Sequence, residues 1–307
     1  MATPPAQVWT IGSLLTWTTD FFARKNIDEP RLSAELLLAH VLNCSRMALY
    51  TQYERVPPDA QIAAFRDLVK QRSSHVPVAY LIGKAWFFSL ELAVSRDVLI
   101  PRPDTETLVE FVIQHARQRP DWAAQNSPRI LDLCTGSGAI AIALAKHLPT
   151  AALVATDISA PALDLARKNA DANAVGGTPP APVSFFQGDL FAAIEHMPAP
   201  ALFHVIASNP PYIPSDDLPR LPPGIRDHEP RLALDGGADG LDFHRRIVAG
   251  ARHHLHPGGL LIMEMQLDQG PALTALLEAA GWLEKVRIIK DAAKLPRCII
   301  AFRPSEP

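Results

Sequence analysis

One short motif combines residue types that could hold a planar amino group: Asn209, Pro210, Pro211 and Tyr212, directly after the apolar run 204–208. We call it the NPPY motif. Consecutive prolines fix φ at about −65° and offer no backbone N–H, so a strand must end here and its carbonyl groups must find partners elsewhere. The motif therefore presents an amide side chain, a backbone carbonyl and an aromatic face in a rigid arrangement. A Pro-Pro turn can also simply end a strand.

A glycine-rich turn lies upstream, between an apolar strand that starts at Arg129 and an alanine-rich helix over 139–147. We call residues 134–138 the glycine loop. Gly136 and Gly138 permit positive φ and close approach of the backbone, and the N–H groups that follow can meet a polar or anionic ligand. The order of strand, turn and helix predicts a ligand cradle. Its spacing is not the dinucleotide pattern, because Ala141 occupies the third glycine position.

Acidic residues follow the next two predicted strands, Asp157 after 152–156 and Asp189 after 183–187. An acid at the end of the second strand is where a ribose diol is held in open parallel sheets. The carboxyl ends of such strands form one crevice, so these acids, the glycine loop and the NPPY motif should meet there. No Walker lysine follows the glycines, which favours a cofactor with a diol but few phosphates. Loop capping is the alternative role for Asp157, and also for Asp132.

The predicted elements divide the chain in three: a helical domain over 1–80, a hairpin over 81–100 and an α/β domain over 101–307. Residues 10–73 carry apolar side chains at helical spacing, which predicts three or four helices. The aromatic and β-branched residues that follow predict a hairpin that reverses near Ser89. After the NPPY motif we expect a long loop over 213–239 that covers the substrate, a helix over 240–255, a strand over 259–265, a helix over 268–280, and strands over 285–290 and 297–302.

Composition limits the function classes. The 307 residues are 48% hydrophobic, with a net charge of −3 and a pI near 6.4, so direct binding to nucleic acid has little support. No apolar run reaches the about 18 residues of a membrane helix, and the first residues do not resemble a signal peptide, so we expect a cytoplasmic protein. Three separated cysteines indicate neither a disulfide framework nor a zinc site, and no metal is expected.

Together the motifs resemble a known family. Residues 132–138 with Asp157 resemble the S-adenosylmethionine site of the seven-stranded methyltransferases, and the NPPY motif resembles their motif for methylating planar nitrogen. Residues 77–83, 99–106 and 227–234 are similar to the HemK/PrmC family of protein-glutamine N5-methyltransferases, which act on class I peptide chain release factors. The match runs from about residue 10 to residue 303. It implies an α/β fold with a mostly parallel, Rossmann-like sheet of seven strands and a small N-terminal helical domain joined by a hairpin.

The resemblance also implies site residues. S-adenosylmethionine would be bound by Cys134, Thr135, Gly136, Ser137, Gly138, Asp157, Asp189, Leu190 and Asn209. The substrate glutamine would be held by Asn209, Pro210, Pro211 and Tyr212. Of these, Asn209, Pro210 and Tyr212 are the catalytic residues: the Asn209 side-chain oxygen and the Pro210 carbonyl accept the two amide protons, and Tyr212 stacks on the amide plane. No general base is assigned to Asp104, Glu106 or Glu229.

Departures from the family pattern keep other substrates open. Cys134 stands where members acting on release factors usually have Gly, and with residues 84–87 it is similar to sister enzymes that methylate a glutamine of ribosomal protein L3, although those usually lack the run at 103–106. Residues 264–266 replace a common Glu-Ile-Gly. Nucleic-acid amino-group methyltransferases use the same type of motif, and a cofactor-binding partner protein is a non-enzymatic alternative. Cys134 suits the glycine loop if its φ is negative; a positive φ would cost about 1 kcal/mol or more relative to Gly.

Overall fold

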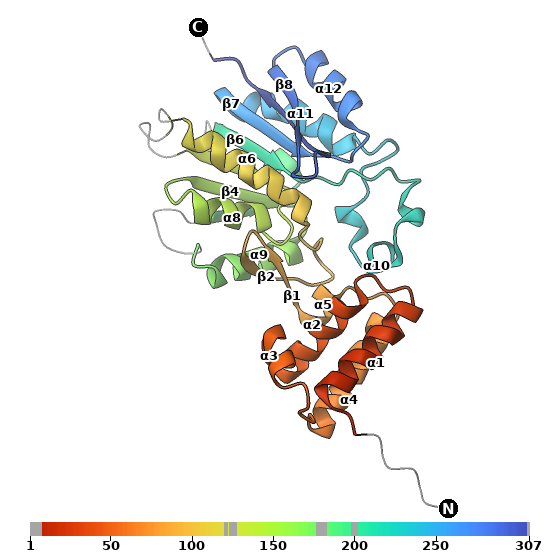
Figure 1. Ribbon diagram of the computed structural model, residues 1–307. Helices are drawn as coiled ribbons and strands as arrows, with labels where there is room; N and C mark the ends of the chain where they lie inside the picture. Colours follow the sequence, from red (N-terminus) through yellow and green to blue (C-terminus); the bar gives the residue numbers. More distant parts are fainter. Residues whose placement is uncertain (1–7, 120–121, 123–127, 176–182, 198–201, 306–307) are drawn as a thin grey trace, which may run out of the picture. The chain divides into compact units, whose positions relative to one another are not determined.

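The computed structural model describes residues 8–119, 122, 128–175, 183–197 and 202–305 (Figure 1). Its contacts form two compact units, Met1–Gly83 with Pro222–His228 and Lys84–Leu221 with Glu229–Pro307. Among the described residues, no helix has both the length and the apolar character needed to cross a membrane.

The N-terminal segment of the first unit is helical, with α1 (Ile11–Arg24), α2 (Pro30–Leu42), α3 (Arg46–Thr51), α4 (Asp59–Arg72) and α5 (Val78–Ile82). Thr10 caps α1, because its hydroxyl accepts a hydrogen bond from the Ser13 N–H at 3.1 Å. Leu15, Leu37 and Phe65 are fully buried and belong to one apolar core. The helices predicted over 10–73 are confirmed as four. We did not predict α5, which starts after Pro77 and ends where Gly83 takes a φ of 72°.

A hairpin opens the second unit, with β1 (Lys84–Phe87) paired antiparallel to β2 (Leu90–Ala93). Phe88 and Ser89 form its two-residue turn with φ values of 50° and 63°, as the twist of a hairpin requires. The predicted reversal at Ser89 is confirmed, and the second strand ends at Ala93, well before the end of the range 81–100 predicted for the hairpin. Asn169 fixes this end, since its side chain accepts a hydrogen bond from the Ala93 N–H at 2.7 Å and donates to the Ala93 carbonyl at 3.0 Å.

The main sheet has the strand order β5-β4-β3-β6-β7-β9-β8. Its strands are β3 (Arg129–Leu133), β4 (Ala152–Asp157), β5 (Val183–Gln187), β6 (Phe203–Ser208), β7 (Leu255–Glu264), β8 (Glu284–Lys290) and β9 (Pro296–Phe302). In this order the five strands from β5 to β7 run parallel. At the other edge β9 pairs antiparallel with β7, and β8 pairs antiparallel with β9, so β8 runs in the same direction as the first five strands. The predicted seven-stranded, mostly parallel sheet is therefore confirmed. The chain leaves β3 in one direction toward β5 and resumes on its other side with β6, which makes the β3/β6 boundary a topological switch point.

Helices cover both faces of this sheet (Figure 1). One apolar core contains residues of α6 (Glu106–Arg117), α8 (Ala139–His147) and α9 (Ala160–Ala172). The other contains residues of α11 (Asp242–His254) and α12 (Gly270–Ala279). The central strand β6 is buried along its whole length, and four of its six residues, Phe203, Val205, Ile206 and Ala207, are apolar.

The predicted start of β7 was wrong. We expected a strand over 259–265, but β7 begins at Leu255. Gly258 takes a φ of 76°, and its N–H donates to the Arg303 carbonyl at 2.9 Å. Residues 257–259, Pro-Gly-Gly, therefore form an irregularity inside β7 and not a turn before it. The pairing with the neighbouring β6 shifts register at this point, between Phe203 and Val205.

Candidate active site

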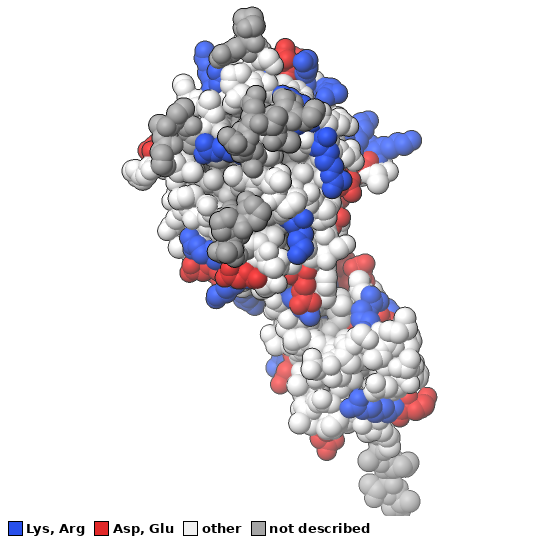
Figure 2. Space-filling model, turned by 90° about the vertical axis from the view of Figure 1, so that its left-hand side faces the viewer, with Lys and Arg blue, Asp and Glu red and all other residues white. Residues whose placement is uncertain are grey.

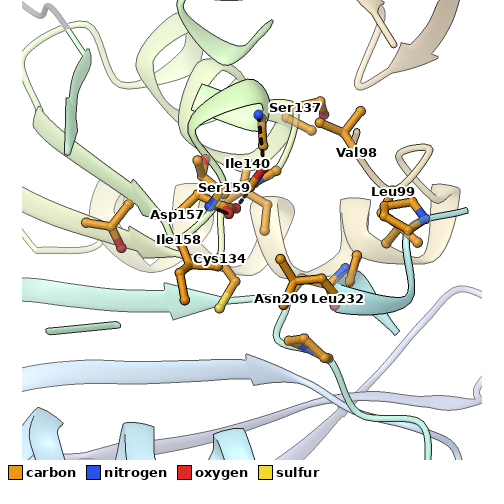
Figure 3. Close-up of a pocket in the computed structure, with 18 of the residues that line it drawn as sticks. Val98, Leu99, Cys134, Ser137, Ile140, Asp157, Ile158, Ser159, Asn209 and Leu232 are labelled. Carbon is orange, nitrogen blue, oxygen red and sulfur yellow. Dashed lines mark hydrogen bonds between the residues drawn. The ribbon is translucent and has the colours of Figure 1, made fainter. Parts of the chain in front are cut away.

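A cavity of about 330 Å³ opens at the carboxyl ends of β3, β4, β5 and β6 (Figure 3). This volume lies within the range of about 300–1,000 Å³ that is usual for small-molecule sites. The structure brings most of the predicted site residues to its wall: Cys134, Thr135, Gly136, Ser137, Asp157, Asp189, Leu190, Asn209 and Pro211. Gly138, Pro210 and Tyr212 are not among the lining residues.

The glycine loop is held against the neighbouring strand, because the Thr135 N–H donates to the Thr156 carbonyl at 2.9 Å. Gly136 has a φ of 55°, and a Cβ atom there would meet nothing within 4 Å, so this position stays open toward a ligand. Gly138 has a different role: a Cβ there would lie 2.9 Å from the Ile142 side chain and 3.1 Å from that of Ala166. Gly138 therefore permits the close approach of α8 and α9.

Cys134 adopts a φ of 61°, so the negative value that would suit cysteine does not occur. We expect Cys134→Gly to be more stable than Cys134→Ala by about 1 kcal/mol, because both remove the sulfur but only glycine accepts this φ without strain. Urea unfolding of the two variants measures the difference. Equal stabilities, or a more stable alanine variant, would contradict a strained conformation at this position.

The Asp157 carboxylate binds two backbone N–H groups at the cavity wall. Its Oδ2 accepts a hydrogen bond from the Gly136 N–H at 2.8 Å and its Oδ1 accepts one from the Ser159 N–H at 2.9 Å, as the dashed lines in Figure 3 show. Burial raises the pKa of this carboxyl group. Each oxygen keeps a further lone pair, so the carboxylate can still accept hydrogen bonds from a ligand. Asp189 lines the same cavity and forms an ion pair of 2.6 Å with Arg246.

Asp132 lies behind the glycine loop and not on the cavity wall. It is 1% exposed, and its Oδ2 accepts hydrogen bonds from the Thr135 hydroxyl at 2.6 Å and the Ala141 N–H at 3.2 Å. Its Oδ1 has no hydrogen-bond partner among the described residues. Burial raises the pKa of Asp132 to about 7, although these two hydrogen bonds act in the opposite direction. Its position agrees with the alternative of a loop-capping carboxylate.

The NPPY motif follows β6 directly. The Asn209 side-chain Nδ2 donates to the Thr105 hydroxyl oxygen at 3.3 Å. The Tyr212 hydroxyl donates to Oε1 of Glu264 at 3.1 Å. The backbone carbonyl of Tyr212 accepts a hydrogen bond from the Gln269 side chain at 2.8 Å. Burial raises the pKa of Tyr212 far above its usual range, so this phenol stays protonated and donates.

The three carboxylates that we did not expect to act as bases have structural partners. Glu106 accepts a hydrogen bond from the Phe88 N–H at 2.7 Å, and Asp104 lies 3.0 Å from Arg297. Glu229 is buried and forms an ion pair of 2.5 Å with Arg102.

The loop over 213–239 is ordered by short helices, η3 (Leu218–Arg220), α10 (Pro223–Arg226) and η4 (Arg231–Ala233). Its two ends meet, since the Ile213 N–H donates to the Leu234 carbonyl at 3.0 Å. Pro230 and Leu232 line the cavity, and Leu232 is 55% exposed. Sequence reasoning did not find these contacts, nor the lining residues Thr105 and Phe243. Of these residues, only Thr105 could have been suspected from the sequence, because it lies in the run 103–106 that resembles the family.

Two family models match the chain: the PrmC N-terminal domain over residues 13–83 and the methyltransferase small domain over residues 110–218. A release factor glutamine methyltransferase from Rhodopirellula baltica is 41% identical over 285 residues, which cover 93% of each chain. The chain belongs to the release factor glutamine methyltransferase family. Another member, from Xylella fastidiosa strain Temecula1, is 45% identical over 274 residues, covering 89% of this chain and 94% of that relative.

Membership confirms the resemblance that the glycine loop, the NPPY motif and residues 77–83, 99–106 and 227–234 indicated, and the protein is a methyltransferase. Among solved structures, a methyltransferase from Pyrococcus furiosus superimposes with a TM-score of 0.50 at 18% identity, over 76% of this chain and 99% of that one. This likeness concerns the fold alone and agrees with the sheet described above.

Proposed function

We propose that this enzyme transfers a methyl group from S-adenosylmethionine to the side-chain nitrogen of a glutamine, and that the glutamine belongs to the Gly-Gly-Gln sequence of a class I peptide chain release factor. The observation that carries the proposal is the position of Asn209, which lines the same cavity as the glycine loop and Asp157. The relatives named release factor glutamine methyltransferase support this substrate. A cytoplasmic location follows from the substrate and is part of the proposal.

The cavity wall suits this cofactor. Asp157 has lone pairs left for ribose hydroxyl groups, and the open Cβ position of Gly136 leaves room at the glycine loop. Ile158 and Leu190 add apolar surface that would hold the adenine ring, and Asp189 would lie beside it. Two arginines, Arg96 and Arg246, line the wall, and Arg246 is paired with Asp189. When bound, S-adenosylmethionine supplies an electrophilic methyl group on a positively charged sulfur.

Orientation must provide much of the catalysis, because the lone pair of a carboxamide nitrogen is delocalised into its carbonyl group. We assign the Asn209 side-chain oxygen and the Pro210 carbonyl as acceptors for the two amide protons, which aims the nitrogen and draws electron density onto it. Tyr212 would stack on the amide plane. The nitrogen loses its extra proton after the transfer, so no strong general base is needed. The structural partners of Asp104, Glu106 and Glu229 agree with that.

The experiment that tests the substrate supplies labelled S-adenosylmethionine with one of three acceptors: a class I release factor, ribosomal protein L3 or DNA. We expect label in the release factor and none in a release factor whose Gly-Gly-Gln glutamine is replaced by glutamate. Label in L3 alone would overturn the choice of release factor while keeping the reaction. Absence of label from every acceptor would favour a cofactor-binding protein without activity.

L3 remains the second candidate because Cys134 and residues 84–87 are similar to the enzymes that act on it. DNA has less support. The net charge is −3, and on the face that Figure 2 shows, Lys and Arg side chains are interspersed with Asp and Glu and form no continuous basic surface. A phosphate backbone is bound mainly through such a surface.

A further inference from the structure

Helix α11 carries an arginine that contacts one of the carboxylates of the cavity. Nη2 of Arg246 donates to Oδ2 of Asp189 at 2.6 Å, and both residues line the cavity. The side chain of Arg246 is 49% exposed and that of Asp189 is 45% exposed. An ion pair this open to solvent contributes little to the stability of a fold. Stability therefore does not account for its presence on the cavity wall.

The turn that carries Asp189 is held in an uncommon backbone conformation. Leu190, the next residue, takes a φ of 52°, which a bulky side chain adopts only where the surrounding contacts impose it. On the other side of Asp189, the Gly188 N–H donates to the Asp157 carbonyl at 3.0 Å. The backbone of this turn is thus fixed on both sides of residue 189. The carboxylate of Asp189 has Arg246 as its hydrogen-bond partner within the part of the chain that the structure describes.

Three residues of α11, spaced four apart, face this turn. Arg246 is the first of them, and it binds Asp189. At the second, Gly250, a Cβ atom would overlap the Phe191 ring, so the missing side chain admits that ring. At the third, the His254 ring stacks on the same phenylalanine, with ring centroids 4.9 Å apart and an interplanar angle of 5°. One face of α11 is therefore packed against the turn, and it presents the guanidinium group from a fixed position.

A second contact restricts the guanidinium group itself. Its central carbon lies 5.6 Å from the centroid of the Phe243 ring, a cation–π distance, and Phe243 also lines the cavity. Arg246 uses Oδ2 of Asp189, whereas Oδ1 accepts no hydrogen bond from any described residue. A carboxylate oxygen can only accept. A ligand group that meets Oδ1 must therefore be a hydrogen-bond donor.

We propose that Arg246 is a positioning residue for cofactor recognition. It holds the Asp189 carboxylate so that Oδ1 accepts a hydrogen bond from the 6-amino group of adenine, and it thereby makes the site selective for adenine over a purine without that group. This inference rests on the proposed function, because it takes S-adenosylmethionine as the cofactor. Arg246 takes no part in the transfer of the methyl group.

Equilibrium binding tests the proposal without turnover. The two ligands are S-adenosylhomocysteine and its analogue with hydrogen in place of the 6-amino group, and calorimetric titration gives the ratio of their Kd values. We expect the wild-type enzyme to prefer the amino ligand by about tenfold or more, and Arg246→Ala to lower this preference to less than about threefold. Arg246→Lys keeps a cation near Asp189 and should retain most of the preference.

The neighbouring arginine provides the matched control. Arg245 also lies on α11, its side chain is 45% exposed, and it pairs with Asp239 and Asp242, but it does not line the cavity. Arg245→Ala should keep the wild-type preference. A double-mutant cycle then tests whether Arg246 acts through Asp189. In the Asp189→Ala background, Arg246→Ala should change the ratio of the two Kd values by less than about twofold.

Two results would overturn the role of Arg246. One is a ratio of Kd values that is near one in the wild type or is unchanged in Arg246→Ala. The other is an equal loss of affinity for both ligands that persists in the Asp189→Ala background, because Arg246 would then act on the ligand directly. If the expected ratios occur in an enzyme that methylates no release factor, the proposed substrate fails and the role of Arg246 stands.

Discussion

Asn209→Ala is expected to lower the rate of methyl transfer by about 10²–10³-fold, the range observed when one preorganised hydrogen-bonding group is removed from an active site. The variant loses the side-chain oxygen that orients the substrate amide. Cofactor binding should remain within about threefold, because the glycine loop and Asp157 supply most of that part of the wall. Single-turnover rates and equilibrium titration with S-adenosylmethionine measure the two quantities separately.

The matched control for this variant is Asn173→Ala, since Asn173 donates to the Glu91 carbonyl at 3.1 Å and does not line the cavity. It should keep the wild-type rate. An Asn209→Ala enzyme that turns over at the wild-type rate would remove the amide from the mechanism. A loss of cofactor affinity as large as the loss of rate would assign Asn209 to the cofactor and not to the substrate.

Asp132→Asn is expected to remove a pH dependence of stability. The pKa of Asp132 is raised to about 7 in the folded enzyme, from an ordinary value of 3.8. Its contribution to the free energy of unfolding is fully present below about pH 4 and is lost as the pH rises to about 7, because only the unfolded chain ionises easily in this interval. The loss is on the order of 4 kcal/mol, and asparagine, which does not titrate, should not show it.

Urea unfolding of the cofactor-free enzyme at several pH values between 4 and 8 measures this effect. The difference in unfolding free energy between Asp132→Asn and wild type should grow in favour of the variant as the pH rises. We compare how this difference changes with pH and not its absolute value, because the NH2 group of asparagine would take the place of Oδ1, which has no hydrogen-bond partner among the described residues. Asp171→Asn, at an exposed position of α9, should leave the profile unchanged. Parallel profiles for wild type and Asp132→Asn would contradict the raised pKa.

The parts of the site that could be predicted from the sequence are those fixed by local order along the chain. The glycine loop, Asp157, Asp189 and Asn209 each follow a strand, and the carboxyl ends of parallel strands meet at one edge of a sheet. Their convergence on one cavity therefore required no knowledge of side-chain packing. The reversal at Ser89 was equally local, because a two-residue turn determines it.

The features that escaped prediction depend on packing between distant segments. Asn209 and Thr105 are 104 residues apart in sequence, and nothing local indicates that they share a hydrogen bond. The same holds for Leu232 on the cavity wall. Tyr212 is a related case, since its hydroxyl is bonded to Glu264 and its ring is not part of the lining; its stacking on a substrate amide stays a prediction. The φ of Cys134 is set by the turn and not by the residue's own preference.

The central claim is that the NPPY motif directs methyl transfer to a glutamine side chain. Tandem mass spectrometry of a class I release factor, after incubation with the wild-type enzyme and S-adenosylmethionine, tests it most directly. We predict one added methyl group on the side-chain nitrogen of the Gly-Gly-Gln glutamine, absent when Asn209→Ala replaces the wild type. A methyl group on any other residue or atom, or the same modification at an equal rate with Asn209→Ala, would contradict the account.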